Sequence, residues 1–188
     1  MTELVIRAAT ETDANAIAFV HVEAWKETYE GLIPDPRLAA LNLADRADRW
    51  TKILRDTVTP ARTSAFIVEV NDRAVGFGSY GGQRSELLAS RGFDGEIEAI
   101  YLLKIAQRRG VGRRLMGLMA TALIDRGFAG GSVWVLRNNV GARHFYETLG
   151  AGILVEREEQ WNNETRVAEL AYGWPDLSLL VCCSETRL

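Results

Sequence analysis

The stretch that decides the fold is Gln107–Arg114, which reads QRRGVGRR. It follows an apolar run at residues 99–103, AIYLL, which is typical of a buried strand. It precedes a helical pattern, because apolar residues recur at spacings of three and four, namely Leu115, Leu118, Met119, Ala122 and Leu123. The sequence therefore predicts a strand that enters a glycine-containing loop, and a helix that begins where the loop ends.

The charge of this stretch is unusual. It holds four arginines, and no acidic residue occurs from position 99 to position 124, although the chain carries a net charge of −3. The positive end of a helix dipole disfavours each cation by roughly a few tenths of a kcal/mol. A bound anion reverses this preference, because the free backbone N–H groups and the dipole both favour phosphate. The alternative is a solvated basic turn.

Three known phosphate-binding loop motifs are comparable with this pattern. A P-loop requires Lys and then Ser or Thr after its last glycine, whereas Arg113 and Arg114 follow Gly112. The dinucleotide fingerprint G-x-G-x-x-G fits Gly110 and Gly112 but meets Leu115 at its third position. The third pattern, Q/R-x-x-G-x-G/A, is matched throughout by residues 107–112. This match resembles the acyl-CoA loop of the GNAT family of N-acetyltransferases.

The surrounding residues support the resemblance and also depart from it. The family usually has a proline where Lys104 stands, often an aromatic residue at Ala106, and often glycine at Arg108. These departures keep the register and indicate a more cationic loop. A second block, residues 139–150 (NVGARHFYETLG), resembles the family signature N-x-x-A-x-x-x-Y-E-x-L-G. The resemblance spans roughly residues 63–172, and its two signatures occur in the expected order.

The resemblance implies a donor, acetyl-CoA, and residues that bind it. Backbone groups of residues 108–113 would hold the pyrophosphate, and those near the end of the preceding strand would hold the pantetheine arm and the acetyl carbonyl. Asn139 either contacts the cofactor or only caps the following helix. The candidate cofactor-binding residues are Ile100, Tyr101, Leu102, Gln107, Arg108, Arg109, Gly110, Val111, Gly112, Arg113 and Asn139.

Acetyl transfer also requires a base and an acid. A free alkylammonium has a pKa of about 10, so it must lose a proton first, and a carboxylate, often through a water, can take it. Glu96 and Glu98 are two residues apart on a predicted strand, so both can face one side. Glu96 matches the position of the general base in some family members, and Glu98 would anchor the substrate, or the roles are exchanged. The alternative is a charged strand face.

Tyr146 matches the tyrosine that protonates the departing thiolate in the family. A phenol with a pKa of about 10 can donate to a sulfur whose thiol has a pKa near 8.5. The alternative is a core tyrosine at helical spacing. Trp25 and Tyr29 lie one helical turn apart in a region that often lines the acceptor side in this family. They are the candidate substrate-binding residues.

Strand and helix patterns alternate as β-α-α-β-β-β-α-β-α-β-β along the chain. This order predicts an α/β (α+β) fold, with a mixed, mostly antiparallel sheet of about seven strands and helices on both faces. We expect one acetyltransferase domain at residues 1–175 and a tail at 176–188, which packs on the domain or on a partner chain. The second helix is expected at 37–54, a loop at 81–94, and the last two strands at 153–160 and 166–172.

Composition and sequence patterns argue against a membrane protein, a metal site and nucleic-acid binding. No apolar run is long enough to span a bilayer, and the N-terminus does not resemble a signal peptide, so we expect a cytoplasmic protein that does not bind membranes. Cys182 and Cys183 are adjacent and have no metal-site spacing, so no metal is expected. The mild net acidity argues against nucleic-acid binding.

The sequence therefore predicts an N-acetyltransferase that transfers an acetyl group from acetyl-CoA to a primary amine of a small molecule or peptide, by direct attack. A non-catalytic acyl-CoA sensor and a basic loop that binds RNA are the alternatives. A homodimer is possible, because dimers are common in the family.

Overall fold

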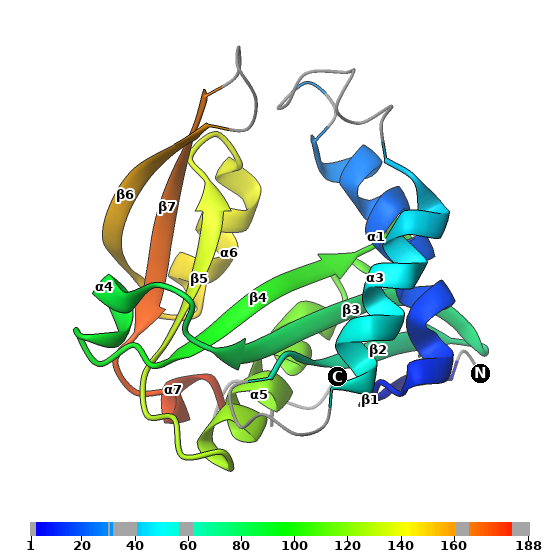
Figure 1. Ribbon diagram of the computed structural model, residues 1–188, viewed down its shortest axis with the longest axis horizontal. Helices are drawn as coiled ribbons and strands as arrows, with labels where there is room; N and C mark the ends of the chain where they lie inside the picture. Colours follow the sequence, from blue (N-terminus) through cyan, green and yellow to red (C-terminus); the bar gives the residue numbers. More distant parts are fainter. Residues whose placement is uncertain (1–2, 30, 32–40, 57–61, 161–165, 182–188) are drawn as a thin grey trace.

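A seven-stranded sheet forms the centre of the molecule in the computed structural model, which describes residues 3–29, 31, 41–56, 62–160 and 166–181 (Figure 1). The strand order is β1-β2-β3-β4-β5-β7-β6. All neighbours are antiparallel except β4 and β5, which are parallel. The strands are β1 (Leu4–Ala8), β2 (Ser64–Val70), β3 (Arg73–Gly82), β4 (Gly95–Leu102), β5 (Gly131–Leu136), β6 (Gly152–Gln160) and β7 (Arg166–Trp174).

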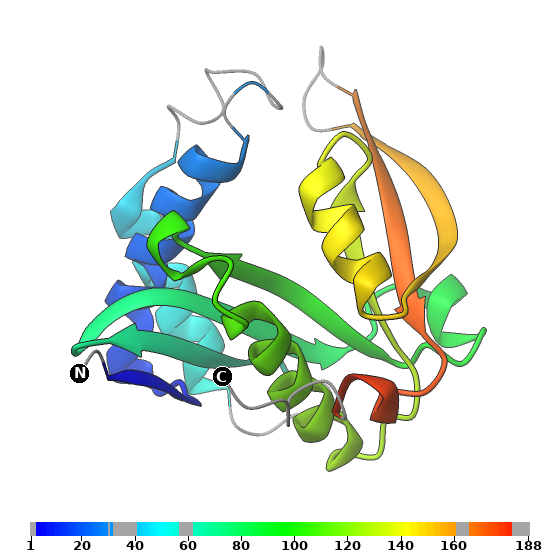
Figure 2. The same cartoon turned by 180° about the vertical axis from the view of Figure 1, so that it is seen from behind.

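Helices cover both faces of the sheet (Figures 1 and 2). On one face, α1 (Ala14–Tyr29) and α3 (Leu43–Arg55) pack on β2 and β3 around Ile67 and Phe77. On the other face lie α5 (Val111–Ile124) and α6 (Val140–Thr148). The short elements are the 3-10 turns η1 (Glu11–Asp13) and η2 (Lys104–Ala106) and the helices α4 (Glu86–Ala89) and α7 (Ser178–Val181). The predicted fold class is confirmed.

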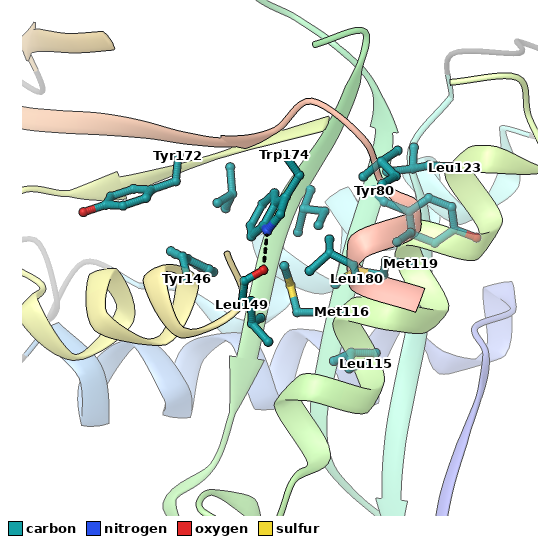
Figure 3. Close-up of a cluster of buried hydrophobic side chains, with 14 of the residues drawn as sticks. Tyr80, Leu115, Met116, Met119, Leu123, Tyr146, Leu149, Tyr172, Trp174 and Leu180 are labelled. Atoms are coloured by element: carbon teal, nitrogen blue, oxygen red, sulfur yellow. Dashed lines mark hydrogen bonds between the residues drawn. The ribbon is translucent and has the colours of Figure 1, made fainter. Parts of the chain in front are cut away.

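The larger core lies beneath α5 and α6 and joins the two halves of the sheet (Figure 3). Trp174 on β7 is fully buried there, and its indole N–H donates to the carbonyl of Leu149 at 2.9 Å. Leu177 and Leu180 are also fully buried, and α7 packs against α5. The first part of the predicted tail therefore packs on the domain. Cys182 and Cys183 lie outside the described residues.

Three sequence expectations differ in detail from the structure. The second helix begins at Leu43 in the described chain, where the Asn42 side chain accepts from the backbone N–H of Ala44 at 2.8 Å; residues 37–40 lie outside the described part. The expected loop at 81–94 is shorter, because β3 continues to Gly82 and α4 forms around the fully buried Leu88. β7 continues to Trp174.

The feature that positions the site is the short pairing between β4 and β5. Only Gly95 with Gly131 and Glu96 with Ser132 are paired, and beyond these residues the two strands diverge (Figure 1). The edge of β4 that faces β5 therefore has unpaired backbone groups over most of its length, and such groups need partners when buried. Within the described residues, no helix is long and apolar enough to cross a membrane.

Candidate active site

A cavity of about 940 Å³ occupies the opening between β4 and β5. It is lined by both strands, by the loop that precedes α5, and by parts of α1 and α6. Most of the residues singled out from the sequence meet there: Trp25, Tyr29, Glu96, Glu98, Ile100, Tyr101, Leu102, Gln107, Arg108, Gly110, Gly112, Arg113, Asn139 and Tyr146. Arg109 and Val111 do not line it, because Arg109 is exposed and the Val111 side chain is buried in the core.

The loop before α5 forms one end of this cavity. Gly110 has a φ of 74° and Arg108 a φ of 59°, so the chain turns through left-handed conformations just before the helix begins. Glycine adopts this conformation freely, whereas at Arg108 it costs on the order of 1 kcal/mol. The first N–H groups of a helix have no intrahelical acceptor. The turn therefore leaves a set of backbone donors at the cavity wall.

The cations of this loop are unpaired in the described chain. Arg108, Arg109, Arg113 and Arg114, together with Lys104, have no carboxylate within 4 Å among the residues that the structure describes. Since these positive charges surround a helix N-terminus, they make this end of the cavity suitable for an anionic ligand.

Hydrogen bonds and close packing hold the loop in place. The Gln107 side chain donates to the carbonyl of Leu102 at 2.8 Å, which ties the loop to the end of β4. A Cβ at Gly112 would lie 3.3 Å from the Phe145 ring, so a larger residue there would press on the contact between α5 and α6. Asn139 caps α6 by accepting from the N–H of Ala142 at 3.1 Å. Its capping role is therefore present, while its contact with a cofactor stays a prediction.

The carboxylate of Glu96 is buried and already paired. Its side chain is 2% exposed, and the Arg84 guanidinium donates to both of its oxygens, at 3.0 Å from Nε and 2.5 Å from Nη2. The backbone N–H of Arg84 donates to Oε2 as well, at 3.1 Å. Because both oxygens accept charged or backbone donors, Glu96 is poorly placed to take a proton from an amine.

Glu98 lies in a different environment. Ser79 pairs with Ala99 and Tyr80 pairs with Ile97, so Glu98 is the extra residue of a β-bulge in β4. Its carboxylate accepts from the Thr63 hydroxyl at 2.7 Å, and no described cation lies within 4 Å of it. Burial raises the pKa of Glu98 above its ordinary value. A carboxylate with a raised pKa is a stronger base.

Tyr146 projects from α6 into the same cavity. It is 5% exposed and packs beside Tyr172 and Trp174, with ring centroids 6.1 and 6.2 Å away (Figure 3). Burial raises the pKa of Tyr146 well above its usual value, so the phenol stays protonated. None of the described residues forms a hydrogen bond with its hydroxyl. The O–H group is therefore available to a ligand.

Aromatic residues form the wall nearest to α1. The hydroxyls of Tyr29 and Tyr101 lie 3.2 Å apart, and the ring of Trp25 meets that of Tyr29 edge-on at 5.1 Å. Behind them His21 stacks on Tyr101 at 5.2 Å and accepts from Trp50 Nε1 at 3.2 Å. Burial lowers the pKa of His21 to about 3, so it supports this wall as a neutral group.

Sequence reasoning missed four residues that line the opposite wall and the rim. Arg157 on β6 donates to the Glu169 carboxylate at 2.8 and 3.0 Å, and its guanidinium lies 3.8 Å from the ring centroid of Trp134. The fourth missed residue is Arg84, which forms an ion pair with Glu96. Strand alternation places Glu169 and Trp134 on one face, but nothing local shows that this face lines a cavity. The described residues hold no group of three or more His, Cys, Asp or Glu that could bind a metal.

The sheet is opened between two parallel strands and has a cationic helix N-terminus at one end of the opening, which fits the acyl-CoA-dependent transferase that the sequence predicts. The chain belongs to the acetyltransferase (GNAT) family, whose model matches residues 17–151. It is 36% identical over 179 residues to the uncharacterized N-acetyltransferase YuaI of Bacillus subtilis, which covers 93% of this chain and 95% of the relative. It is 27% identical to the probable N-acetyltransferase Rv2775 of Mycobacterium tuberculosis over 143 residues, 76% of each chain.

Solved structures show the same fold. The PaiA N-acetyltransferase of Thermoplasma acidophilum, in complex with coenzyme A, matches with a TM-score of 0.65 and 16% identity over 89% of this chain and 98% of that one. The putative acetyltransferase yncA of Salmonella typhimurium, with its cofactor acetyl-CoA, matches with a TM-score of 0.67 and 15% identity over 93% and 94%. The family and its named relatives identify the protein as an acetyltransferase.

Proposed function

We propose that this protein transfers the acetyl group of acetyl-CoA to a primary amine of a small molecule or peptide by direct attack. The observation that carries the proposal is one cavity, which the cationic loop, Glu98 and Tyr146 all line. The loop and the first turn of α5 would hold the pyrophosphate, and the unpaired edge of β4 at residues 100–102 would hold the pantetheine amides. An acceptor would enter beside Trp25 and Tyr29.

Glu98 is the proposed base. It takes a proton from the acceptor ammonium, and the free amine nitrogen then attacks the thioester carbon. The new C–N bond forms as the C–S bond breaks, and the sulfur leaves with the electron pair. The second amine proton is lost to solvent. Glu96 holds Arg84 at the rim of the cavity and is proposed as a positioning residue for that reason.

Tyr146 is the proposed acid. Burial keeps the phenol protonated, so its O–H group can donate to the sulfur as the C–S bond breaks, and the phenolate that a full transfer leaves regains its proton from solvent. The two cysteines of the chain are adjacent at positions 182 and 183, and this pattern does not favour a covalent enzyme intermediate, so direct attack is proposed. The cytoplasmic location, the homodimer and the domain boundary at residue 175 stay predictions from the sequence.

The test is thiol release from acetyl-CoA with an amine library, measured for the wild type, Tyr146→Phe and Tyr80→Phe. Tyr80 is a matched control, because it is a buried tyrosine of β3 that does not line the cavity. We expect Tyr146→Phe alone to lower turnover. Tight acetyl-CoA binding without turnover on any amine would instead identify a sensor, and undiminished turnover in Tyr146→Phe would remove this residue from the mechanism.

A further inference from the structure

Glu27 of α1 helps to fix the point at which the chain leaves β4 and enters the loop before α5. The backbone N–H of Leu103 still donates to the carbonyl of Val75 on β3, at 2.9 Å. The next N–H along the chain, that of Lys104, donates instead to the carboxylate of Glu27, at 2.8 Å. The N–H of Ala106 then donates to the carbonyl of Leu103 as the chain turns through η2. Glu27 therefore accepts the first backbone donor beyond the sheet.

The Glu27 carboxylate has no described partner that competes with this bond. No cation of the described chain, the Lys104 ammonium included, lies within 4 Å of it. Glu27 and Lys104 both line the cavity. Because the acceptor is ionised, such a hydrogen bond is about twice as strong as one between neutral groups. The bond from the Lys104 N–H is thus the described contact that orients this side chain.

The last turn of α1, which lies beside the end of β4, also carries the proposed acceptor wall (Figure 1). Trp25 and Tyr29 line the cavity two residues before and two residues after Glu27. The Tyr29 hydroxyl shares a hydrogen bond of 3.2 Å with that of Tyr101, but this bond ends on the strand. Of the hydrogen bonds between described residues, only that of Glu27 joins α1 to the loop. It therefore connects the proposed acceptor wall with the proposed cofactor site.

We propose that Glu27 is a positioning residue that links the loop before α5 to the acceptor wall on α1. A ligand that fixes the loop then also fixes the last turn of α1, and the effect is reciprocal. The inference rests on the part of the proposed function that puts the pyrophosphate of acetyl-CoA at this loop. The alternative role for a carboxylate in the cavity is to bind the acceptor ammonium. Linkage needs an oxygen that accepts from the Lys104 N–H, whereas an ammonium needs the negative charge.

Two pairs of variants separate these roles. Glu27→Ala removes both the oxygen and the charge, whereas Glu27→Gln keeps an oxygen that can accept. Lys104→Pro removes the N–H donor and leaves the carboxylate. The backbone accommodates this proline, because Leu103 is extended, with φ of −60° and ψ of 149°, and Lys104 is the first residue of a 3-10 turn. Lys104→Gln is its reference, since it removes the same side-chain charge and keeps the N–H.

The control is Glu23→Ala, which makes the same change one helical turn earlier on α1. Glu23 pairs with Lys26 and does not line the cavity. Both Glu→Ala variants alter the helix propensity of α1 in the same way, and an exposed ion pair contributes little to stability. A difference between them therefore comes from the bond to the loop.

The measured quantity is the rate of amide hydrogen exchange at residues 22–29, without CoA and with saturating CoA, which binds but has no acetyl group to transfer. The ratio of the two rates within one variant cancels changes in intrinsic exchange. In the wild type we expect CoA to slow exchange by at least about fivefold, the lower end of the usual coupling between two sites. In Glu27→Ala and Lys104→Pro the ratio should fall toward one. Glu27→Gln, Lys104→Gln and Glu23→Ala should keep most of the effect.

Calorimetry of CoA binding completes the test. By reciprocity, CoA should bind Lys104→Pro several-fold more weakly than Lys104→Gln. An unchanged exchange ratio in Glu27→Ala and Lys104→Pro would overturn the inference, and so would a loss in Glu27→Gln as complete as that in Glu27→Ala. CoA binding to the wild type without slower exchange at residues 22–29 would overturn the inference and leave the proposed function intact. A wild type that binds no CoA would overturn both.

Discussion

Replacing Glu98 by Gln tests the proposed base most directly. The substitution keeps the shape of the side chain, and its amide oxygen can still accept from the Thr63 hydroxyl, which lies 2.7 Å from the carboxylate. It removes the site that takes the proton. A general base contributes about 10²–10⁴-fold to the rate, so we expect kcat to fall by about 10³-fold, or roughly 4 kcal/mol of transition-state stabilisation.

The pH profile distinguishes a lost base from a distorted site. Below the pKa of Glu98 the carboxyl is protonated and cannot accept, so wild-type kcat should fall as the pH drops through that pKa. Burial raises this pKa above 4.5, so the midpoint should lie above 4.5. In Glu98→Gln this acidic limb should disappear. The deficit should also shrink as the pH approaches about 10, where a free amine no longer needs to lose a proton.

Stability supplies an independent check. A carboxyl whose pKa is raised by folding binds its proton more tightly in the folded state, so its contribution to stability falls as the pH rises through that pKa. At neutral pH the ionised Glu98 therefore opposes folding. Glu98→Gln should unfold at the same temperature as the wild type or a higher one. Thermal unfolding measures this, and it separates the loss of chemistry from a loss of structure.

Glu96→Gln is the matched control, and steady-state kinetics from pH 4 to pH 10 is the assay. This variant breaks the ion pair with Arg84 but should keep the acidic limb of the profile. If Glu98→Gln retained kcat within about threefold of the wild type, the assignment of the base would be wrong. If Glu96→Gln lost the limb instead, the two carboxylates would have the opposite roles.

Three further predictions follow from contacts that the structure shows. Gly112→Val should weaken acetyl-CoA binding at least about tenfold in calorimetry, because a Cβ would lie 3.3 Å from Phe145; retained affinity would contradict the role given to the loop. Asp13 has a pKa lowered to about 2, chiefly by its hydrogen bonds from Arg7, so the free energy of unfolding should fall as the pH drops from 3.8 toward 2, and Asp13→Asn should flatten this dependence in urea titrations. Leu180→Ala should cost about 2–5 kcal/mol in the same titrations, since this side chain is fully buried; a change below about 0.5 kcal/mol would mean that α7 does not belong to the cooperative unit.

The elements that depend on local spacing could be predicted from the sequence. Apolar repeats place α5 and α6, and Asn and Asp are residues that favour turns, as at Asn71 and Asp72, which have φ of 49° and 59° between β2 and β3. Glycines at 110 and 112 and the tyrosine at 146 belong to continuous signatures, so their common cavity followed from the family pattern. The proposed choice of Glu98 over Glu96 as the base could not be predicted from the sequence, because it depends on the ion pair between Glu96 and Arg84, which no spacing reveals.

The other features of the site and core could not be predicted, because they depend on contacts between residues that are far apart in the sequence. Arg157, Glu169 and Trp134 lie on three different strands, and their mutual stacking and pairing exist only once β5, β6 and β7 are side by side. Likewise, Leu177 and Leu180 form an ordinary short apolar pattern, and only the position of α5 shows that they complete the core. A charge or an apolar side chain acquires its role from the group opposite, which lies far away along the chain.

The site exists because β4 and β5 pair only over a short part of their length. Full pairing of β4 with β5 would satisfy their backbone groups, yet it would also close the cavity, so the two strands pair at only two positions. The halves of the sheet are joined instead by the core beneath them, where Tyr80 and Ile97 from one half meet Tyr172 and Trp174 from the other. Hydrophobic burial is not directional, so it can hold two strands at a divergent angle where ladder hydrogen bonds cannot. The opening, with its unpaired β4 edge, the proposed base Glu98 at the bulge and the proposed acid Tyr146 on α6, is therefore maintained by packing on the opposite side of the sheet from the proposed acceptor site.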